Sequence, residues 1–353
     1  MIDNNFEPLI DHIINSNESI NIDGRAGCGK SYLISGIQQK IISLGKKVIS
    51  VAPTNKSANL IKGKTIHKFC LEFKSKKSVK DLQCDYIILD EVSMLSECFY
   101  KYLICLKHQR PDIKFVIVGD FEQLAPVCDR INESVEVGKN KRKFTEYFDY
   151  KNSGALFELC DNNRIELTTC RRADTELYNL CLNVEELDVS KFSSKSTKVN
   201  LSFTNKKRME VNKFYMDEVE KEKANKIKAL IIPKHKYDSN SQEMKLFVNT
   251  PLIARKTSKI LNIMNNQMGK ITKINTDTKE ITIKMDDLSE VLSIKFDKFN
   301  ILFFPAYCLT IFKCQGETYN HNYTIHQWSM LNSREKYVAL SRGTKKRFIN
   351  IIN

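Results

Sequence analysis

The sequence predicts an α/β protein with a helix-covered parallel sheet, followed by a second unit of the same class that contains an all-β segment. Up to about residue 165, dense apolar runs alternate with amphipathic helices, and such runs are typical of strands buried on both faces. The alternation begins again near residue 199, and short strands separated by turns fill residues 245–305. We therefore expect two domains, 1–165 and 166–353, which suits a chain of 353 residues.

The elements of the first unit follow from hydrophobic spacing. Residues 6–16 and 31–45 carry apolar side chains at helical spacing, so both segments predict amphipathic helices. Gly45 is a typical residue for ending the second of them. The expected strands are apolar runs, and they cover residues 19–23, 46–53, 85–91 and 114–120. The charged segment 133–154 is expected to be a loop.

The second unit repeats the α/β pattern around its β-rich segment. Residues 199–205 predict a strand, and residues 206–228 a long charged helix. Strands and turns alternate over 245–305, which predicts an all-β element lodged inside the unit. Residues 308–316 and 337–342 complete the unit.

Charge and cysteine content restrict the partners and the compartment. Lys and Arg number 56 against 42 Asp and Glu, a net charge of +14, which favours a polyanionic partner over generic basicity. The sequence has no run of 18 apolar residues and no basic, apolar N-terminal leader, so we expect neither a membrane span nor secretion. Eleven cysteines without a C-x-x-C pair disfavour a disulfide scaffold and indicate a reducing compartment. We expect a soluble intracellular protein, cytoplasmic or nuclear, with no membrane partner.

The strongest motif is a phosphate-binding loop. Residues 24–31, GRAGCGKS, fit G-x-x-x-x-G-K-S between an expected strand and an expected helix. Glycines let backbone N–H groups surround a phosphate, Lys30 neutralises the β- and γ-phosphates, and the Ser31 hydroxyl can bind Mg²⁺. A glycine-rich helix start without a ligand is the alternative, and the strand–loop–helix context disfavours it. The expected nucleotide-binding residues here are Gly24, Ala26, Gly27, Cys28, Gly29, Lys30, Ser31 and Tyr32.

Two further groups follow later strands of the same expected sheet. Asp90 and Glu91 end an apolar strand, where one acid can hold Mg²⁺ and the next can activate an attacking water. Gln123 follows the expected strand at 114–120 and could reach both a γ-phosphate and a water. Ordinary strand-end acids and a polar loop are the alternatives. The phosphate-binding loop in the same chain favours the catalytic interpretation.

Nine motifs in a fixed order resemble those of superfamily 1 helicases, in particular the superfamily 1B branch of RecD, Dda and Pif-type DNA helicases. They are GRAGCGKS, VAPTNKSA, TIHKF, LDEVSML, GDFEQLAPV, LTTCRR, FTNKK, LTIFKCQGETY and YVALSRGTK, and the resemblance covers residues 20–349. The resemblance implies two tandem RecA-like P-loop domains. It also implies a small SH3-like β insertion at about 245–305 in the second domain and a minimal strand-separating pin, a short hairpin at most, at 70–84 in the first.

The resemblance assigns catalytic roles to five residues. By likeness, Lys30 holds phosphates, Glu91 is the general base and Gln123 senses the γ-phosphate. Arg171 in LTTCRR and Arg342 in YVALSR resemble the two arginine fingers that the second domain supplies. An arginine on the transferred phosphoryl group is worth roughly 10³–10⁵ in rate.

The same likeness implies ATP and Mg²⁺ as cofactors. Ser31 and Asp90 would hold Mg²⁺, and Gly316 and Glu317 would touch the γ-phosphate and the ribose. Arg172 is an alternative to Arg171 as the first finger.

The likeness also implies contacts with single-stranded DNA. Hydroxyls, amides and lysines suit a phosphate track, whereas histidine and phenylalanine suit base stacking. His67 by itself would be an ordinary packed or surface histidine, and its place in TIHKF favours a functional role. The expected contacts are Pro53, Thr54, Asn55, Lys56, Thr65, His67, Phe69, Thr204, Asn205, Thr310, Phe312, Lys313 and Gln315.

Three departures from the family pattern affect the expected activity. The glutamine that reads adenine is missing near the N-terminus, where Asn5 or Glu7 could substitute. Phe312 stands where the family has histidine, and only residues 70–84 are available for a pin. We expect an ATP-dependent helicase or translocase that acts as a monomer on single-stranded DNA, with 5′-to-3′ movement implied by the resemblance. The alternatives are a viral-type RNA helicase and a nucleotide-switched single-strand-binding translocase without strong unwinding.

Overall fold

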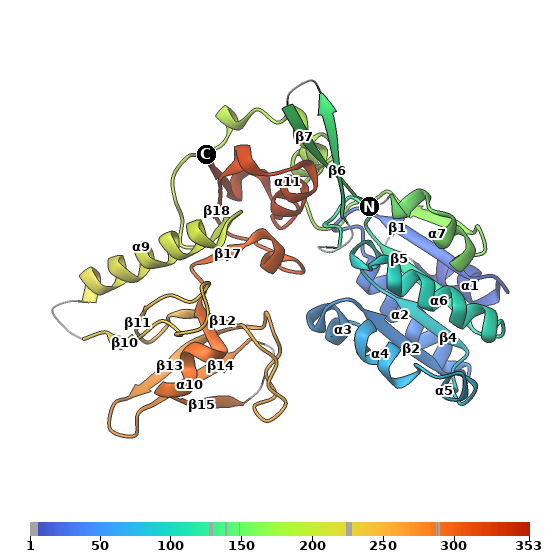
Figure 1. Cartoon of the computed structure of the whole chain (residues 1–353), viewed down its shortest axis with the longest axis horizontal. Helices are drawn as coiled ribbons and strands as arrows, with labels where there is room; N and C mark the ends of the chain where they lie inside the picture. Colours follow the sequence, from blue (N-terminus) through green and yellow to red (C-terminus); the bar gives the residue numbers. More distant parts are fainter. Residues whose placement is uncertain are drawn as a thin grey trace. The chain divides into compact units, whose positions relative to one another are not determined.

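The computed structural model describes residues 6–126, 130–137, 140–147, 149–223, 228–286, 288 and 290–353. The chain divides into two compact units, Met1–Ala173 and Asp174–Asn353 (Figure 1). Strand β8 (Arg164–Leu167), which straddles the boundary expected after residue 165, pairs with a strand of the first unit. In the described part of the chain, no helix is both long and apolar enough to cross a membrane.

The first unit contains a six-stranded parallel sheet in the order β3-β2-β4-β5-β1-β8. Its strands besides β8 are β1 (Ile20–Gly24), β2 (Val48–Ala52), β3 (Lys64–Thr65), β4 (Tyr86–Leu89) and β5 (Lys114–Gly119). Its helices are α1 (Glu7–Asn15), α2 (Lys30–Ser43), α3 (Asn55–Leu60), α4 (Ile66–Glu72), α5 (Lys76–Lys80), α6 (Glu97–Gln109) and α7 (Gly154–Leu159). The predicted parallel sheet, its four predicted strands and the first two helices are confirmed.

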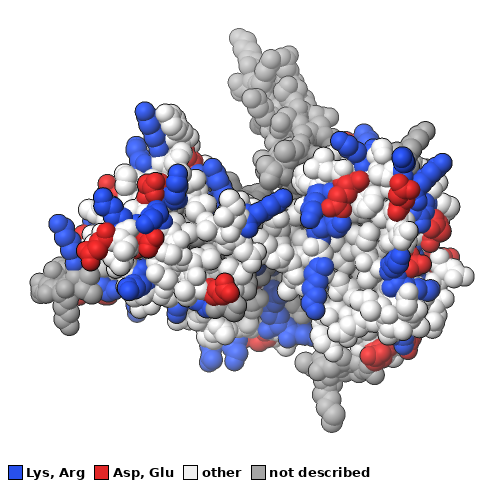
Figure 2. All heavy atoms as spheres, turned by 90° about the horizontal axis from the view of Figure 1, so that it is seen from below, with Lys and Arg blue, Asp and Glu red and all other residues white. Residues whose placement is uncertain are grey.

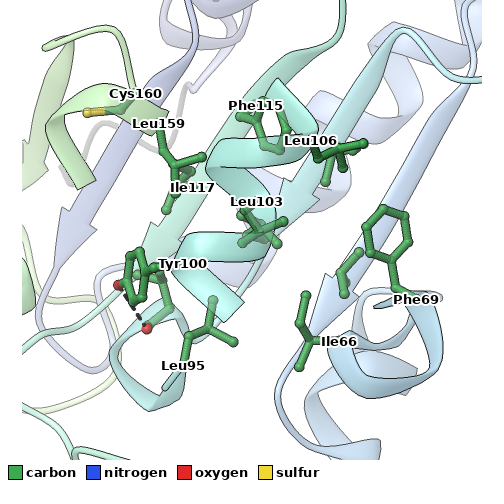
Figure 3. Close-up of a cluster of buried hydrophobic side chains, with 14 of the residues drawn as sticks. Ile66, Phe69, Leu95, Tyr100, Leu103, Leu106, Phe115, Ile117, Leu159 and Cys160 are labelled. Carbon is green, nitrogen blue, oxygen red and sulfur yellow. Dashed lines mark hydrogen bonds between the residues drawn. The ribbon is translucent and has the colours of Figure 1, made fainter. Parts of the chain in front are cut away.

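Helices cover both faces of this sheet because alternate residues of its strands point to opposite sides. Phe115 and Ile117 of β5 join a buried cluster with α4, α6 and α7, in which Phe69 and Leu103 also lie (Figure 3). Val116 and Val118 of the same strand join a second cluster with side chains of α1 and α2. Every residue of β4 and β5 is buried, as the dense apolar runs predicted.

Two local predictions in the first unit were wrong. Residues 70–84, where a short hairpin was expected, contain no strand. They hold the end of α4 and all of α5, which begins at a capping box in which the Ser75 hydroxyl accepts from the Ser78 N–H at 3.1 Å. The segment expected to be a charged loop instead contains an antiparallel hairpin, β6 (Arg130–Val137) with β7 (Asn140–Tyr147). Its β-branched and aromatic residues favour strands, and the surrounding charges obscured that signal.

The second unit combines a parallel sheet with an antiparallel one. The parallel sheet has the order β17-β9-β18-β19, and the antiparallel sheet has the order β15-β14-β13-β12-β16. The antiparallel sheet lies where the all-β element was predicted. The strands are β9 (Asn200–Ser202), β10 (Leu230–Ile232), β11 (Met244–Leu246), β12 (Pro251–Ala254), β13 (Met268–Asn275), β14 (Glu280–Met285), β15 (Val291–Lys295), β16 (Phe303–Pro305), β17 (Cys308–Thr310), β18 (Tyr323–His326) and β19 (Ile349–Ile352).

The helices of the second unit are α8 (Thr175–Leu182), α9 (Asn205–Lys223), α10 (Phe296–Leu302) and α11 (Ser333–Leu340). The predicted long charged helix is confirmed as α9, and residues 224–227 of that prediction lie outside the described residues. A buried cluster of β-sheet side chains, with Met216 of α9 and Phe299 of α10, fills the antiparallel part.

Candidate nucleotide site and nucleic-acid contacts

The loop between β1 and α2 has the backbone that a phosphate cradle needs. Gly27 and Gly29 have φ angles of 86° and 87°, in the left-handed region that glycine adopts without strain. A Cβ atom on Gly27 would lie 2.8 Å from the Cβ of Arg172, so no larger residue fits there. Backbone turns of this kind direct successive N–H groups toward one point, where they bind anions.

Lys30 begins α2 and folds back over this loop. Its Nζ donates to the carbonyl oxygens of Gly24 and Arg25, the latter at 3.0 Å. The next two residues, Ser31 and Tyr32, are exposed on the first turn of the helix. The ammonium group and the Ser31 hydroxyl therefore belong to the same loop end as the glycines.

Two acidic residues follow β4. Asp90 is 5% exposed, and its Oδ1 accepts from the Glu91 N–H at 2.8 Å. Burial raises the pKa of Asp90 to about 7, and the charge of Glu91 adds to this, while Lys30 opposes it. Glu91 has a φ of 51°, a conformation that a non-glycine residue adopts at an energetic cost, and such residues cluster at functional sites.

The donor set fits Mg²⁺ shared with a nucleotide. Mg²⁺ typically takes one or two protein oxygens and completes its shell with phosphates and water. Asp90 supplies one buried carboxylate in the field of Lys30, and Ser31 supplies an exposed hydroxyl. Within the described ranges, no group of three or more His, Cys, Asp or Glu side chains forms a self-contained metal site.

Gln123 is held in the loop after β5. It is 9% exposed, and its Nε2 donates to Oδ2 of Asp120 at 2.9 Å. Its neighbour Glu122 lies 4.0 Å from Arg25 of the phosphate-binding loop. Asp120 also acts electrostatically on Cys28 of that loop. The predicted residues after β1, β4 and β5 therefore lie at the carboxyl edge of one sheet, where ligands of open α/β sheets bind.

Arg171 belongs to the first unit, which corrects its expected place on the second domain. Its backbone N–H donates to the Gly27 carbonyl at 2.8 Å, and the Cys170 thiol contacts the Ala26 carbonyl at 3.8 Å. Its guanidinium lies 4.0 Å from the centre of the Phe6 ring. The segment after β8 is thus fastened to the phosphate-binding loop, and this contact positions Arg171 beside it.

Arg342 lies in the second unit with the other predicted nucleotide contacts. It is 3% exposed, and its Nη1 donates to the Glu317 carbonyl at 3.4 Å, while Nη2 donates to the Ser341 hydroxyl at 2.9 Å. Gly316 has a φ of 80°, so the turn before Glu317 requires glycine. The structure therefore brings together two motifs that lie 25 residues apart along the chain.

In the first unit, the residues predicted to contact single-stranded DNA lie at the starts of two helices. Thr54 caps α3 by accepting from the Ser57 N–H at 3.1 Å, and Thr65 caps α4 by accepting from the Lys68 N–H at 3.4 Å. Pro53, Asn55 and Lys56 flank the first cap and are half-buried. Both caps leave their helix N-termini at the sheet edge that carries the phosphate-binding loop.

His67 and Phe69 lie on opposite sides of α4. His67 is exposed, with its ring 4.7 Å from that of Phe99 in an edge-on arrangement. Phe69 is fully buried in the core beside Ile66 (Figure 3). The expected stacking of Phe69 on a base is therefore wrong, because helical spacing turns this side chain into the sheet-facing cluster.

In the second unit the predicted contacts gather near the start of α9. The Thr204 hydroxyl accepts from the Lys207 N–H at 3.1 Å and donates to Gln327, while Asn205 accepts from Arg208. Thr310 is buried at the end of β17. The three predicted residues after it are half-buried, namely Phe312, Lys313 and Gln315. Lys and Arg outnumber Asp and Glu on the face drawn in Figure 2.

Known proteins share both the sequence and the fold of this site to a measurable degree. A model described as AAA domain matches residues 10–129. The mouse ATP-dependent DNA helicase PIF1 is 30% identical over 131 residues, 31% of this chain and 20% of that protein. The dda helicase of Enterobacteria phage T4 is 27% identical over 198 residues, 51% of this chain and 41% of that protein.

Solved structures extend the likeness to the whole chain. The Candida albicans Pif1 helicase structure matches with a TM-score of 0.64 at 19% identity, covering all of this chain and 95% of the other. A Pif1 structure described for DNA unwinding at forked DNA gives 0.65 at 19% identity, covering 99% and 92%. The chain is therefore similar to Pif1 and Dda helicases, which are of the superfamily 1B type. Its fold is that of tandem RecA-like domains.

Some site residues were not predicted from the sequence. Phe6, which packs on Gly29 and under Arg171, lies between Asn5 and Glu7, the two residues considered as substitutes for the missing glutamine. Arg208 and Arg255 carry no motif, and their neighbourhood depends on contacts between distant segments. The sequence signal for this neighbourhood is Arg208, a single arginine in the lysine-rich start of α9. The chain spans a fifth to two fifths of the length of the two curated relatives named above.

Proposed function

We propose that this chain is an ATP-driven motor of the helicase type that moves on single-stranded DNA. One observation carries the proposal: the first unit places a glycine-cradled loop, Lys30, the Asp90–Glu91 pair, Gln123 and Arg171 at one sheet edge. The relatives named ATP-dependent DNA helicase, and a Pif1 structure described with ADP-AlF3 and single-stranded DNA, support the same activity.

The proposed chemistry assigns each side chain a task. The loop N–H groups and Lys30 bind the phosphates, and Ser31 and Asp90 hold the Mg²⁺ that neutralises charge on them. Glu91 takes the proton of the attacking water, and Gln123 orients that water. Arg171 stabilises the charge that develops on the transferred group.

The second unit couples hydrolysis to the strand. By likeness, Arg342, Gly316 and Glu317 supply the remaining nucleotide contacts, so turnover depends on residues of the second unit as well as the first. Single-stranded DNA that binds to residues of both units would favour the hydrolysis-competent state and stimulate hydrolysis. We assign the first unit to domain 1A and the second to domain 2A, with the antiparallel sheet as the SH3-like domain 2B.

Further details of the proposal follow from the likeness and the composition. Movement is 5′-to-3′ and the protein acts as a monomer. A reducing compartment, cytoplasm or nucleus, suits the ten described cysteines, which are all free thiols. We expect weak strand separation, because residues 70–84 contain no strand and form the end of α4 and the short helix α5 instead of a hairpin pin.

The test is the ATPase rate against single-strand concentration for wild type, Arg342→Ala, Arg342→Lys and the exposed-site control Arg347→Ala. We expect strong stimulation in wild type and the control, and none in either Arg342 variant, with strand affinity retained within severalfold. Arg342→Lys keeps the charge but not the forked donor geometry, so it separates chemistry from folding. A wild-type ATPase that is indifferent to single strands would overturn the motor and favour the nucleotide-switched binding module.

The substrate is tested separately. Matched DNA and RNA strands compete for the protein, and forked duplexes with 5′ or 3′ tails report polarity and unwinding. Preference for RNA would favour the RNA-helicase alternative. Stimulated ATPase without strand separation would show a translocase.

A further inference from the structure

Three cations from distant segments surround one aromatic ring in the second unit. The guanidinium of Arg208 on α9 lies 4.8 Å from the centre of the Phe304 ring, and that of Arg255, directly after β12, lies 4.5 Å from it. Nζ of Lys313 lies 5.6 Å from the same centre. We call these four residues the Phe304 cluster. Because cations occupy its faces and it is 6% exposed, Phe304 is a platform for charge and not for a base.

The cluster has more positive than negative charge. Among the described residues, Asp238 is the carboxylate that acts on Lys313, and it already forms an ion pair with Arg255. Arg255 also donates from Nη1 to the Asn300 carbonyl at 2.8 Å. Three cations against one acid leave an excess of two positive charges in a half-buried position. Such an excess is costly to fold unless an anion balances it.

Two groups in the cluster lack the partners that their burial requires. Arg208 is 2% exposed; its Nε donates to Asn205 and its Nη2 to the Asn240 carbonyl at 2.6 Å. Its Nη1 is buried and has no hydrogen-bond acceptor among the described residues. Lys313 forms neither a hydrogen bond nor an ion pair with any described side chain. Burial lowers its pKa to about 8, and the two arginines add to this while Asp238 opposes it.

We propose that the Phe304 cluster is a binding site for a backbone phosphate of the nucleic-acid strand, with Lys313 and Arg255 touching the phosphate and Arg208 positioned beneath them. The inference rests on the proposed single-strand binding and adds Arg208 and Arg255 to it. The cluster adjoins the predicted contacts, since Asn205 bonds Arg208 and Lys313 lies between Phe312 and Gln315. A phosphodiester brings one negative charge and free oxygens, which match the charge excess and the unused donors.

Lys313 gives the site a pH signature. Burial beside the two arginines brings its pKa down to about 8, so its charge changes near neutrality. A bound phosphate returns the pKa of Lys313 toward its ordinary value, so strand binding takes up a proton above pH 8. Affinity is therefore nearly full at pH 7 and below, and it falls about tenfold between pH 7 and pH 9. Lys313→Arg keeps the charge, so it removes this dependence.

The experiment measures the affinity of wild type and variants for a short labelled single-stranded oligothymidine by fluorescence anisotropy. Lys313→Gln should weaken binding about tenfold and make the dependence on salt shallower. The matched control Lys273→Gln removes one charge from an exposed position on β13 and should change affinity by less than twofold or so. Asp238→Asn retains the acceptor shape and removes the opposing charge, so it should tighten binding severalfold, a gain that misfolding would not produce.

The outcomes separate the two proposals. The phosphate site is overturned, and the motor is left intact, if two results occur together. The first is that Lys313→Gln and Lys273→Gln change the affinity for the single strand equally. The second is that Lys313→Arg has the same pH profile of binding as wild type. Weaker binding by Asp238→Asn overturns the phosphate site as well. A wild-type protein that binds no single strand overturns the proposed function, and the phosphate site with it.

Discussion

Acid is expected to destabilise the second unit through one buried histidine, His326 of β18. The imidazole is 5% exposed, and its Nε2 lies 3.0 Å from Oδ1 of Asn200. The Asn200 amide donates to the carbonyls of Thr197 and Tyr307, so its Oδ1 accepts and Nε2 of His326 carries the proton. Nδ1 is buried and has no partner within the described ranges. A second proton would therefore occupy a buried position with no acceptor.

The size of the effect follows from the pKa of His326, which burial lowers to about 4 from an ordinary 6.5, with Lys207 adding to the effect and Glu210 opposing it. Between these two values the unfolded chain binds a proton that the folded chain does not, so stability is lost as the pH falls. The difference amounts to about 3 kcal/mol in total, and about 2 kcal/mol of it is lost by pH 5. Above pH 6.5 the contribution is complete.

Urea unfolding followed by the fluorescence of Trp328 measures this. Trp328 is the single tryptophan, is 5% exposed and lies two residues from His326, so it reports on the second unit. His326→Gln keeps an N–H donor toward Asn200 and does not titrate. From pH 8 to pH 5, wild type should lose about 2 kcal/mol more stability than the variant. An equal loss in both proteins would refute the reasoning, because the other titrating groups are common to both.

Three further predictions concern the proposed site. Glu91→Gln keeps the shape of the side chain but cannot accept a proton, so turnover should fall at least ~10²-fold with nucleotide binding retained, whereas the control Glu18→Gln, at an exposed position before β1, should stay near wild type. Near-normal turnover of Glu91→Gln would remove Glu91 from its role. Phe69→Ala should lower the unfolding free energy of the first unit by about 3–5 kcal/mol in urea without weakening the binding of single-stranded DNA, whereas His67→Ala, at an exposed position, should weaken that binding without lowering stability. A DNA-binding defect confined to Phe69→Ala would contradict the placement of Phe69 in the core. Because no glutamine precedes Gln38, steady-state turnover of ATP and GTP should agree within about tenfold, and a strong preference for ATP would show that other residues read the base.

The strands and the phosphate-binding loop could be predicted because their signals are contiguous in the sequence. The apolar runs of β4 and β5 and the glycines before Lys30 are contiguous in sequence, so their structure follows from periodicity and backbone freedom. Helix α5, within residues 70–84, was harder to predict because its start depends on a capping box of two serines in a lysine-rich segment. A capping motif of four residues is easily hidden by the charge that surrounds it.

Site residues that depend on contacts between distant segments were the ones that sequence reasoning misplaced or missed. Arg171 was expected on the second domain, and its hydrogen bond to Gly27 joins positions 144 residues apart. Phe69 shared a motif with His67, yet only the position of α4 on the sheet determines which of the two is buried. The Phe304 cluster joins residues 208, 255 and 313, and no spacing rule connects them.

The segment between β12 and β16 of the antiparallel sheet begins and ends at neighbouring positions. Ala254, at the end of β12, is the register partner of Phe303, at the start of β16, and the Arg255 N–H donates to the Leu302 carbonyl at 2.9 Å. Residues 256–302 are therefore an excursion with adjoining ends, and an excursion of this kind can be lengthened, shortened or replaced without altering the path of the chain around it. Arg255 and Phe304 lie next to these adjoining ends, so a change of length within 256–302 would leave both residues in place.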